Sequence, residues 1–185
     1  MRRGVAINGQ RVLAVIPARG GSKRCPRKNI RAFRGSPLVA WALDAARRSK
    51  LVDEIIVSTE DAEIREVALR LGASVQIRPN ELATDEASNE DVLRHVLATH
   101  PAEWVVLLQP TSPLRTAEDI EACIERAQIG DGCITYSTGT WAKNGAVYVA
   151  RREWIEKHDF SHTGLLKLYM PPERSIDIDY PEQFE

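Results

Sequence analysis

The chain has 185 residues, of which 43% are hydrophobic and 28% charged, proportions that do not support a disordered tail, a collagen repeat or a membrane protein. Its 25 lysines and arginines balance 26 aspartates and glutamates, so the formal net charge of -1 lacks the basic excess of a nucleic-acid-binding surface. The length predicts a single domain over residues 1–185, with residues 1–10 as an N-terminal extension.

Short apolar runs alternate with segments in which apolar residues recur at i, i+3, i+4 and i+7. The runs are typical of strands buried on both faces of a sheet, and the periodic segments of helices that cover it. In chain order we expect a strand at 12–16, helix 38–45, strand 55–57, helix 64–71, strand 75–77, a helix after Ser88, strand 105–108, helix 120–127, and strands 133–135 and 146–149.

The helix ends support this order. Ser88 with Asp91 and Thr116 with Asp119 match the capping-box pattern, and Gly72 is placed to close the second helix. Alternating strands and helices predict an α/β fold of three layers, α/β/α and Rossmann-like, with a mostly parallel sheet. Ligands of such folds bind outside the carboxyl ends of the strands, here in the loops after residues 16, 59, 77 and 108.

The loop after the first strand, residues 17–29, is called the cationic loop below. Gly20 and Gly21 allow backbone amides to approach an anion, and Ser22 adds a hydroxyl donor. The loop could be a solvated basic surface, but its place at the end of a buried strand favours a polyphosphate site. It matches neither G-x-x-x-x-G-K-S/T nor G-x-G-x-x-G. Its five cations are Arg19, Lys23, Arg24, Arg27 and Lys28.

Residues 17–24 (PARGGSKR) and 26–30 (PRKNI) closely resemble the opening motif of the acylneuraminate cytidylyltransferases, or CMP-sialic acid synthetases. Further segments resemble motifs of that family in the same order: 78–85 (RPNELATD), 109–115 (QPTSPLR), 144–146 (NGA) and 175–179 (SIDID). The resemblance implies a nucleotide-diphospho-sugar transferase fold. It also implies transfer of CMP from CTP to the anomeric hydroxyl of an acidic, sialic-acid-like nonulosonate, with release of pyrophosphate and with Mg²⁺ as cofactor.

The resemblance also assigns roles to residues. It implies catalytic roles for Arg19, Lys28 and Asp179, and metal binding by Asp177 and Asp179. The residues implied in nucleotide binding are Arg19, Gly20, Gly21, Ser22, Lys28, Asn29, Arg78, Ser88 and Gln109.

Three of these residues have structural alternatives. Ser88 is a helix cap, a ligand contact or both, because a cap serine already faces the place where an anion is stabilised. Arg78 precedes a proline, so its backbone is expected to be extended and its guanidinium could instead serve a surface ion pair. Gln109 could be only a polar strand end, but we favour a contact with nucleotide or sugar.

Asp177 and Asp179 are two residues apart. On a strand both carboxylates would point to one face and Ile176 and Ile178 to the other. Mg²⁺ commonly takes one or two carboxylates and completes its shell with water and substrate phosphates. The pair therefore fits the metal site that the family resemblance implies.

The sequence departs from the family between the sixth strand and Asn144. Only residues 138–143 lie there, where family members usually carry several dozen residues that supply a dimerisation arm and arginines for the acidic sugar. The nucleotide half of the site is therefore complete and the sugar half is not, and the expectation of a homodimer is weakened. Alternatives are a related transferase with another nucleotide or acceptor, such as a guanylyltransferase, and a non-catalytic nucleotide-binding paralogue. Paired metal ligands argue against the paralogue.

The remaining expectations concern partners and location. We expect CTP and an acidic sugar as partners. Nucleic acid is not expected because the charge is balanced, and a membrane is not expected because no stretch approaches the roughly 20 apolar residues of a membrane span. The three cysteines, Cys25, Cys123 and Cys133, lack metal or redox spacing and predict buried or idle thiols in a reducing compartment. The N-terminus lacks the apolar region of a signal peptide, so a cytoplasmic location is expected.

Overall fold

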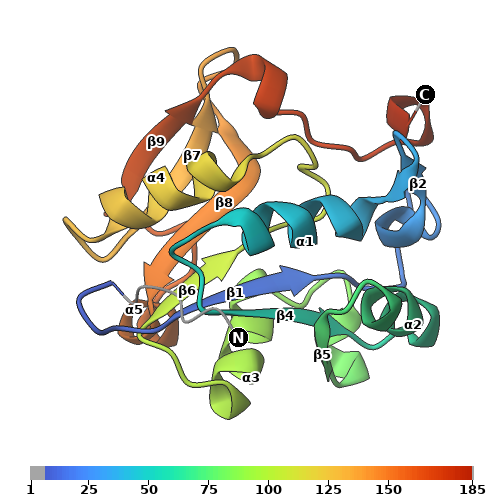
Figure 1. The fold of residues 1–185 in the computed structure, drawn as a ribbon, viewed down its shortest axis with the longest axis horizontal. Helices are drawn as coiled ribbons and strands as arrows, with labels where there is room; N and C mark the ends of the chain where they lie inside the picture. The colour runs from blue at the N-terminus through green and yellow to red at the C-terminus, as the bar shows by residue number, and fades with distance from the viewer. Residues whose placement is uncertain (1–6, 185) are drawn as a thin grey trace.

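A computed structural model describes residues 7–184, and in it the apolar runs of the sequence form one seven-stranded sheet (Figure 1). The strands are β1 (Val12–Pro17), β4 (Glu54–Thr59), β5 (Ser74–Ile77), β6 (Trp104–Leu107), β7 (Gly132–Ser137), β8 (Lys143–Arg151) and β9 (Leu166–Met170). A separate hairpin pairs β2 (Ala32–Phe33) with β3 (Ser36–Pro37). Residues 1–6 of the expected N-terminal extension lie outside the described residues, whereas Ile7 and Gln10 form an antiparallel bridge.

The helices lie between the strands as the alternation predicts. The α-helices are α1 (Leu38–Arg48), α2 (Ala62–Arg70), α3 (Asn89–Thr99), α4 (Ala117–Ala127) and α5 (Arg152–Lys157). Single 3₁₀ turns are η1 (Lys28–Ile30), η2 (Asn80–Ala83), η3 (Pro172–Arg174) and η4 (Pro181–Phe184). Ser88 and Thr116 form complete capping boxes with Asp91 and Asp119, and Gly72 follows α2 with a φ of 71°, so these three predictions are confirmed.

The sheet is mostly parallel, with strand order β5-β4-β1-β6-β8-β7-β9. Its centre consists of the apolar runs, because parallel strands covered on both faces need apolar side chains on both. β8 alone runs antiparallel to its neighbours β6 and β7, since a short hairpin joins it to β7. The carboxyl ends of β1, β4, β5 and β6 therefore meet at one edge of the sheet.

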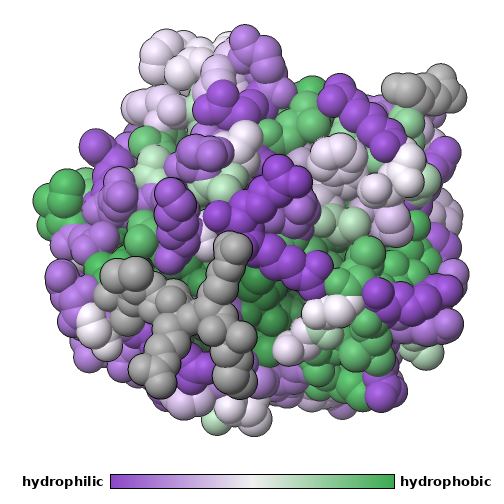
Figure 2. All heavy atoms as spheres, viewed as in Figure 1, coloured by the Kyte–Doolittle hydropathy of each residue, from purple (hydrophilic) through white to green (hydrophobic). Residues whose placement is uncertain are grey.

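Helices cover both faces, which confirms the three-layer architecture. Val12, Ala14 and Ile16 of β1 pack in a core with α1, α2 and α4, whereas Leu13 and Val15 pack with α3 and α5. This alternation is the period of two that sends successive strand side chains to opposite faces. Figure 2 shows hydrophilic and hydrophobic side chains interspersed over the surface on the α1 and α4 side.

The prediction of a strand around Asp177 and Asp179 is wrong. Residues 175–180 have no regular secondary structure, and the last strand of the sheet is instead β9, which is not one of the continuous apolar runs of the sequence. The chain leaves β9 and runs across the molecule to the β2–β3 hairpin (Figure 1). We call residues 171–184 the C-terminal segment. It pairs with no strand, and its anchors are buried side chains and a few hydrogen bonds, described below.

Two further expectations concern the cysteines and the membrane. Cys25, Cys123 and Cys133 are buried and free, as predicted. Among residues 7–184 there is no helix with the length and apolar character needed to cross a bilayer. The cytoplasmic location stays a prediction.

Candidate functional site

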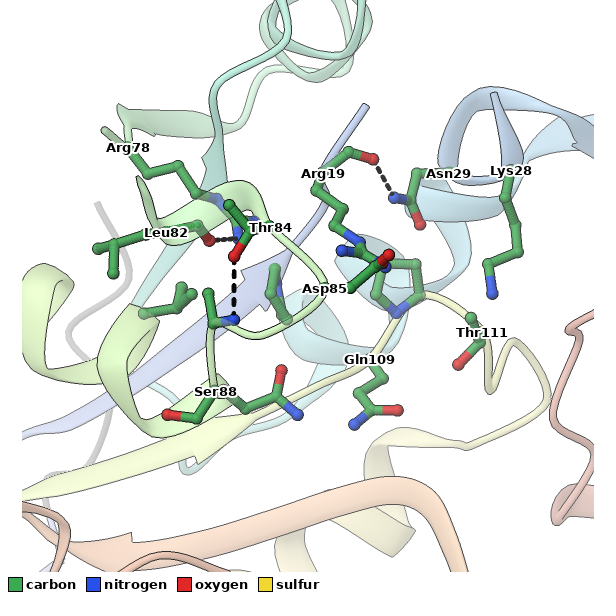
Figure 3. A pocket seen from close by; sticks show the side chains of 15 residues that line it. Arg19, Lys28, Asn29, Arg78, Leu82, Thr84, Asp85, Ser88, Gln109 and Thr111 are labelled. Carbon is green, nitrogen blue, oxygen red and sulfur yellow. Dashed lines mark hydrogen bonds and ion pairs between the residues drawn. The ribbon is translucent and has the colours of Figure 1, made fainter. Parts of the chain in front are cut away.

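A cavity of about 250 Å³ opens at the carboxyl edge of the sheet, where the loops after β1, β5 and β6 meet. Figure 3 shows Arg19, Lys28 and Asn29 on one side of it and Ser88 and Gln109 on the other. Parallel strands direct their following loops to one edge, so residues far apart in sequence come together here. Of the predicted nucleotide-binding residues, the cavity is lined by Arg19, Lys28, Asn29, Arg78, Ser88 and Gln109.

A second, more open cavity adjoins the first along the cationic loop. Gly21, Ser22 and Lys23 line it, and Arg19 and Asp85 line both cavities. The two cavities together thus give an elongated, cation-lined cleft, which suits an extended polyphosphate better than a compact neutral ligand.

Carboxylates that follow β4 hold the cationic loop in shape. The amide of Gly20 donates to Glu60 Oε1 at 2.6 Å, and a Cβ at position 20 would overlap the carboxylate of Asp61. Arg27, which has a φ of 59°, donates to Asp61 Oδ2 at 2.6 Å and also pairs with Glu63. Asp61 in turn caps α2, and the pKa of its carboxyl is lowered mainly by the Arg27 hydrogen bond. Gly20 is therefore needed for close packing of the loop against α2.

The backbone of Arg19 is held from inside the loop. Asn29 is buried and donates through Nδ2 to the Arg19 carbonyl at 2.9 Å. This bond shows a structural role for Asn29, which is also one of the residues that line the cavity. The position of the Arg19 guanidinium is set separately, by an ion pair with Asp85 across the cleft.

Arg78 is a buried arginine, so the alternative of a surface ion pair is wrong. Its guanidinium donates to the carbonyls of Ser58 at 2.6 Å and Leu82 at 3.1 Å. Burial lowers its pKa to about 10, and Glu60, 3.7 Å from Nε, opposes that shift. Arg78 thus joins the end of β4 to η2, and its charge also lies in the cavity wall.

Ser88 is a helix cap that also lines the cavity. Its hydroxyl accepts from the Asp91 amide at 3.1 Å and donates to Asp91 Oδ2 at 2.7 Å. The structural alternative is therefore confirmed, and a ligand contact stays a prediction. Any such contact would come from the first turn of α3, where backbone amides favour an anion.

Gln109 lies where β6 meets the start of β8. A Cβ on Gly145, whose φ is 71°, would lie 3.1 Å from Gln109 Oε1, so the first residues of β8 pass close against this side chain. Asn144 is itself buried, accepting from Thr135 Oγ1 at 2.7 Å and donating to Ser175 Oγ at 3.0 Å. The motifs at 109–115, 144–146 and 175–179 are therefore joined in one hydrogen-bonded structure.

The two carboxylates of the C-terminal segment lie beside the cationic loop. Asp179 accepts from Lys28 Nζ at 2.9 Å and from Arg24 Nη1 at 2.5 Å, and the Lys28 bond is the main cause of its lowered pKa. Burial raises the pKa of Asp177, opposed by a hydrogen bond with Thr111 and reinforced by the charge of Asp179. The structure thus brings together the predicted phosphate-binding and metal-binding residues.

Side chains hold the backbone of this carboxylate pair. Ile178, between the two aspartates, is fully buried against Phe33 and Leu38, and its amide donates to the Thr111 carbonyl at 2.7 Å. Gln183 accepts from the Asp179 amide at 2.7 Å and donates to the Asp177 carbonyl at 2.9 Å. These contacts give both aspartates a defined backbone without a strand.

Several residues of the site were not identified from the sequence. Asp85 and Glu60 bind the cationic loop, and Thr111 meets Asp177 and Ile178. Arg115 is fully buried and donates to the Gln109 carbonyl, and burial lowers its pKa to about 9. Asp85, Thr111 and Arg115 lie in segments that resemble family motifs, and this resemblance could have identified them. Glu60 lies in no such segment.

The family model described as Cytidylyltransferase matches residues 13–146. A similar curated protein is the CMP-N,N'-diacetyllegionaminic acid synthase of Legionella pneumophila, 44% identical over 121 residues that cover 62% of this chain and 52% of the relative. Another is the N-acylneuraminate cytidylyltransferase of Streptococcus agalactiae serotype III, 40% identical over 211 residues that cover 93% of this chain and 51% of the relative. The chain therefore spans about half the length of these relatives.

Solved structures share the fold. The synthetase for CMP:2-keto-3-deoxy-manno-octonic acid, in complex with CTP, has a TM-score of 0.78 at 16% identity and covers 93% of this chain, which covers 94% of it. A Mycobacterium tuberculosis protein solved with manganese has a TM-score of 0.69 at 16% identity and covers 94% of this chain, which covers 96% of it.

Proposed function

The chain belongs to the cytidylyltransferase family, and on that premise we propose that it transfers CMP from CTP to the anomeric hydroxyl of an acidic nonulosonate, releasing pyrophosphate. One observation carries the proposal, the contact of the cationic loop with the carboxylate pair, in which Lys28 Nζ lies 2.9 Å from Asp179 Oδ1. A protein that only binds phosphate needs the cations, whereas nucleotidyl transfer also needs acidic oxygens for a divalent cation.

In this proposal the cleft binds the nucleotide along its length. Arg19 and Lys28 hold the triphosphate through charge-assisted hydrogen bonds, and Gly21 and Ser22 contribute donors from the open cavity. Asn29 contacts the nucleoside, and Ser88 and Gln109 lie on the opposite wall. Arg78 contributes positive charge from within that wall, although its hydrogen bonds go to the backbone.

The carboxylate pair fits Mg²⁺. Within residues 7–184 no cluster of three or more histidine, cysteine, aspartate or glutamate side chains is suited to a metal, so water and phosphate would complete the shell around Asp177 and Asp179. That arrangement is usual for Mg²⁺. Burial and the charge of Asp179 both raise the pKa of Asp177, and a bound cation would offset both. When bound, Mg²⁺ supplies positive charge to phosphate oxygens and orients them.

The chemistry asks mainly for positioning and charge. The anomeric oxygen bonds to the α-phosphorus, the bond from that phosphorus to the bridging oxygen breaks, and pyrophosphate leaves with the electron pair while the hydroxyl proton passes to water. Negative charge grows on the phosphate oxygens as pyrophosphate departs, and Arg19 and Lys28 stand where they can stabilise it. Both side chains are placed before the reaction, because each is held by a carboxylate.

The sugar class rests on the names of the relatives, which include a legionaminic acid synthase and an N-acylneuraminate cytidylyltransferase. The alignment with the Streptococcus protein runs over 211 positions but uses 93% of the 185 residues, so several dozen of its positions have no counterpart here. That fits the short connection between β7 and β8, where only residues 138–142 lie.

Pyrophosphate release is the direct test. The protein is incubated with Mg²⁺, one of the four nucleoside triphosphates and a panel of acidic sugars, including sialic, legionaminic and pseudaminic acids. Release that needs both CTP and a nonulosonate supports the proposal. Turnover with GTP would instead support a guanylyltransferase, and CTP binding without turnover on any sugar would support a non-catalytic nucleotide-binding protein. Size measurement by light scattering tests the homodimer in the same samples.

A further inference from the structure

Asp85 is the one carboxylate in the described structure that pairs with both Arg19 and Lys23 of the cationic loop. It lies between η2 and α3, and its Oδ1 is 2.6 Å from Arg19 Nη2 while its Oδ2 pairs with Lys23. Both carboxylate oxygens therefore face cations, much as two oxygens of a phosphate group would. The Asp85 side chain is 35% exposed, so it has room to leave.

The ion pair of Arg19 and Asp85 lies at the boundary between the two cavities. Arg19 and Asp85 line both the cavity that contains Lys28 and Gln109 and the open cavity that contains Lys23. A phosphate chain that extends from one cavity into the other must pass this boundary. There it would meet Arg19 and Lys23, the two cations that form ion pairs with Asp85 in the empty protein.

The other cations of the loop are held differently. Arg27 binds Asp61, whose carboxylate is also held in place by the two backbone amides of α2 that it caps. Arg24 and Lys28 both bind Asp179 of the proposed metal pair. Within residues 7–184, by contrast, Asp85 accepts no backbone hydrogen bond, and Arg19 and Lys23 have no other ion-pair partner.

We propose that Asp85 is a displaceable counter-ion of the triphosphate site, a role that rests on the proposed function. In the empty protein it holds Arg19 and Lys23 over the cleft. When a triphosphate enters, the phosphate oxygens take these donors and the Asp85 side chain turns to solvent. After transfer, Asp85 competes with pyrophosphate for the same donors and favours its release. Hydrogen bonds from Lys23 and Arg19 lower the pKa of Asp85, so the competitor is charged at neutral pH.

Asp85→Asn tests the role, because it removes the charge and keeps the shape. Binding of inorganic pyrophosphate, and separately of CTP, is measured by isothermal titration calorimetry. We expect the dissociation constant of each to fall about two- to fivefold, the effect of losing partly exposed competing ion pairs. The matched control is Glu81→Gln, which removes the same charge from an exposed residue of η2 that lines neither cavity and has no ion pair among the described residues. That control should bind as the unchanged protein does.

Two outcomes overturn the proposal. If Asp85→Asn binds pyrophosphate no more tightly than Glu81→Gln, Asp85 does not compete with phosphate. If it binds more weakly, Asp85 serves to orient Arg19 and the bound phosphate does not replace it. Failure of the proposed function gives a different result, in which the unchanged protein itself binds neither CTP nor pyrophosphate. In steady-state assays the proposal further predicts a lower KM for CTP in Asp85→Asn, with a kcat that does not rise.

Discussion

The cationic loop and the C-terminal segment lie against each other, joined by the ion pairs of Arg24 and Lys28 with Asp179, but they are built in different ways. The loop presents five cations whose partners are carboxylates from other segments, and ion pairs such as Arg19 with Asp85 are partly exposed. The C-terminal segment presents two carboxylates whose positions depend on the buried side chain of Ile178 and on hydrogen bonds from Gln183. Partly exposed ion pairs exchange easily, whereas buried packing does not.

This difference has a functional meaning under the proposed activity. The loop must release pyrophosphate after every turnover, so its contacts need to be exchangeable. The carboxylate pair must keep one geometry for a divalent cation, which demands a supported backbone. Substitutions in the two regions should therefore have different kinetic signatures.

The largest effect is expected from Asp179→Asn. It removes a carboxylate that lies between Lys28 and Arg24 and belongs to the proposed metal pair, so turnover should fall by at least about a hundredfold. Pyrophosphate release measures the loss, and circular dichroism should show an intact fold. Glu182→Gln, an exposed change in the same segment, serves as control. Unchanged activity in Asp179→Asn would refute the metal assignment.

Ile178→Ala should show how far the carboxylate pair depends on its buried anchor, because it removes the anchor and leaves both carboxylates in the chain. The side chain is fully buried, so its loss should lower the free energy of unfolding by about 2–4 kcal/mol. It should also reduce kcat more than it changes the KM for CTP, because the carboxylate pair loses its anchor. Ile176→Ala is a matched control, since Ile176 is 38% exposed two residues away. Equal losses of stability in urea unfolding for the two variants would contradict this account.

Arg19→Ala should act on binding. The loss of one charge-assisted contact should raise the KM for CTP about tenfold and change kcat less. Steady-state kinetics with CTP varied at a saturating sugar concentration measure this. The control is Lys50→Ala, an exposed cation at the end of α1, outside both cavities. An unaltered KM for CTP would show that Arg19 does not bind the phosphates.

The smallest effect is expected in the pH dependence of stability, through the ion pair of Asp61 with Arg27 of the cationic loop. The pKa of Asp61 in the fold is below its ordinary value of about 3.9, so its ionised form favours folding. This contribution is present above that ordinary value and is lost as the pH falls through the lower pKa of the folded state. Asp61→Asn keeps a good helix cap but loses the charge pair with Arg27. In urea unfolding, the stability difference between the two proteins should shrink below about pH 4. A difference that is independent of pH would exclude the ion pair as its cause.

Much of the fold could be predicted because its signals are local. The strands at the sheet centre and the caps of α3 and α4 follow from neighbouring residues and from periodicity. β9 was not found because it is not a continuous apolar run: only alternate residues of Leu166–Met170 face the interior, as in a half-buried strand at the edge of a sheet. The strand expected at Asp177 and Asp179 failed because alternation of apolar and acidic residues does not reveal whether a partner strand is available.

The sequence by itself determined the layers, the cationic loop at the end of the first strand, and the motifs that place the chain among cytidylyltransferases. Only the tertiary structure decided which charges meet. Arg19 and Asp85 are 66 positions apart, and Lys28 and Asp179 are 151 positions apart. Helix caps join residues three positions apart and can be found by spacing, but ion pairs across a cleft depend on how the strands are ordered. The same reason explains Arg78, for which the sequence left open a surface ion pair, whereas β4 and η2 enclose its guanidinium in the structure.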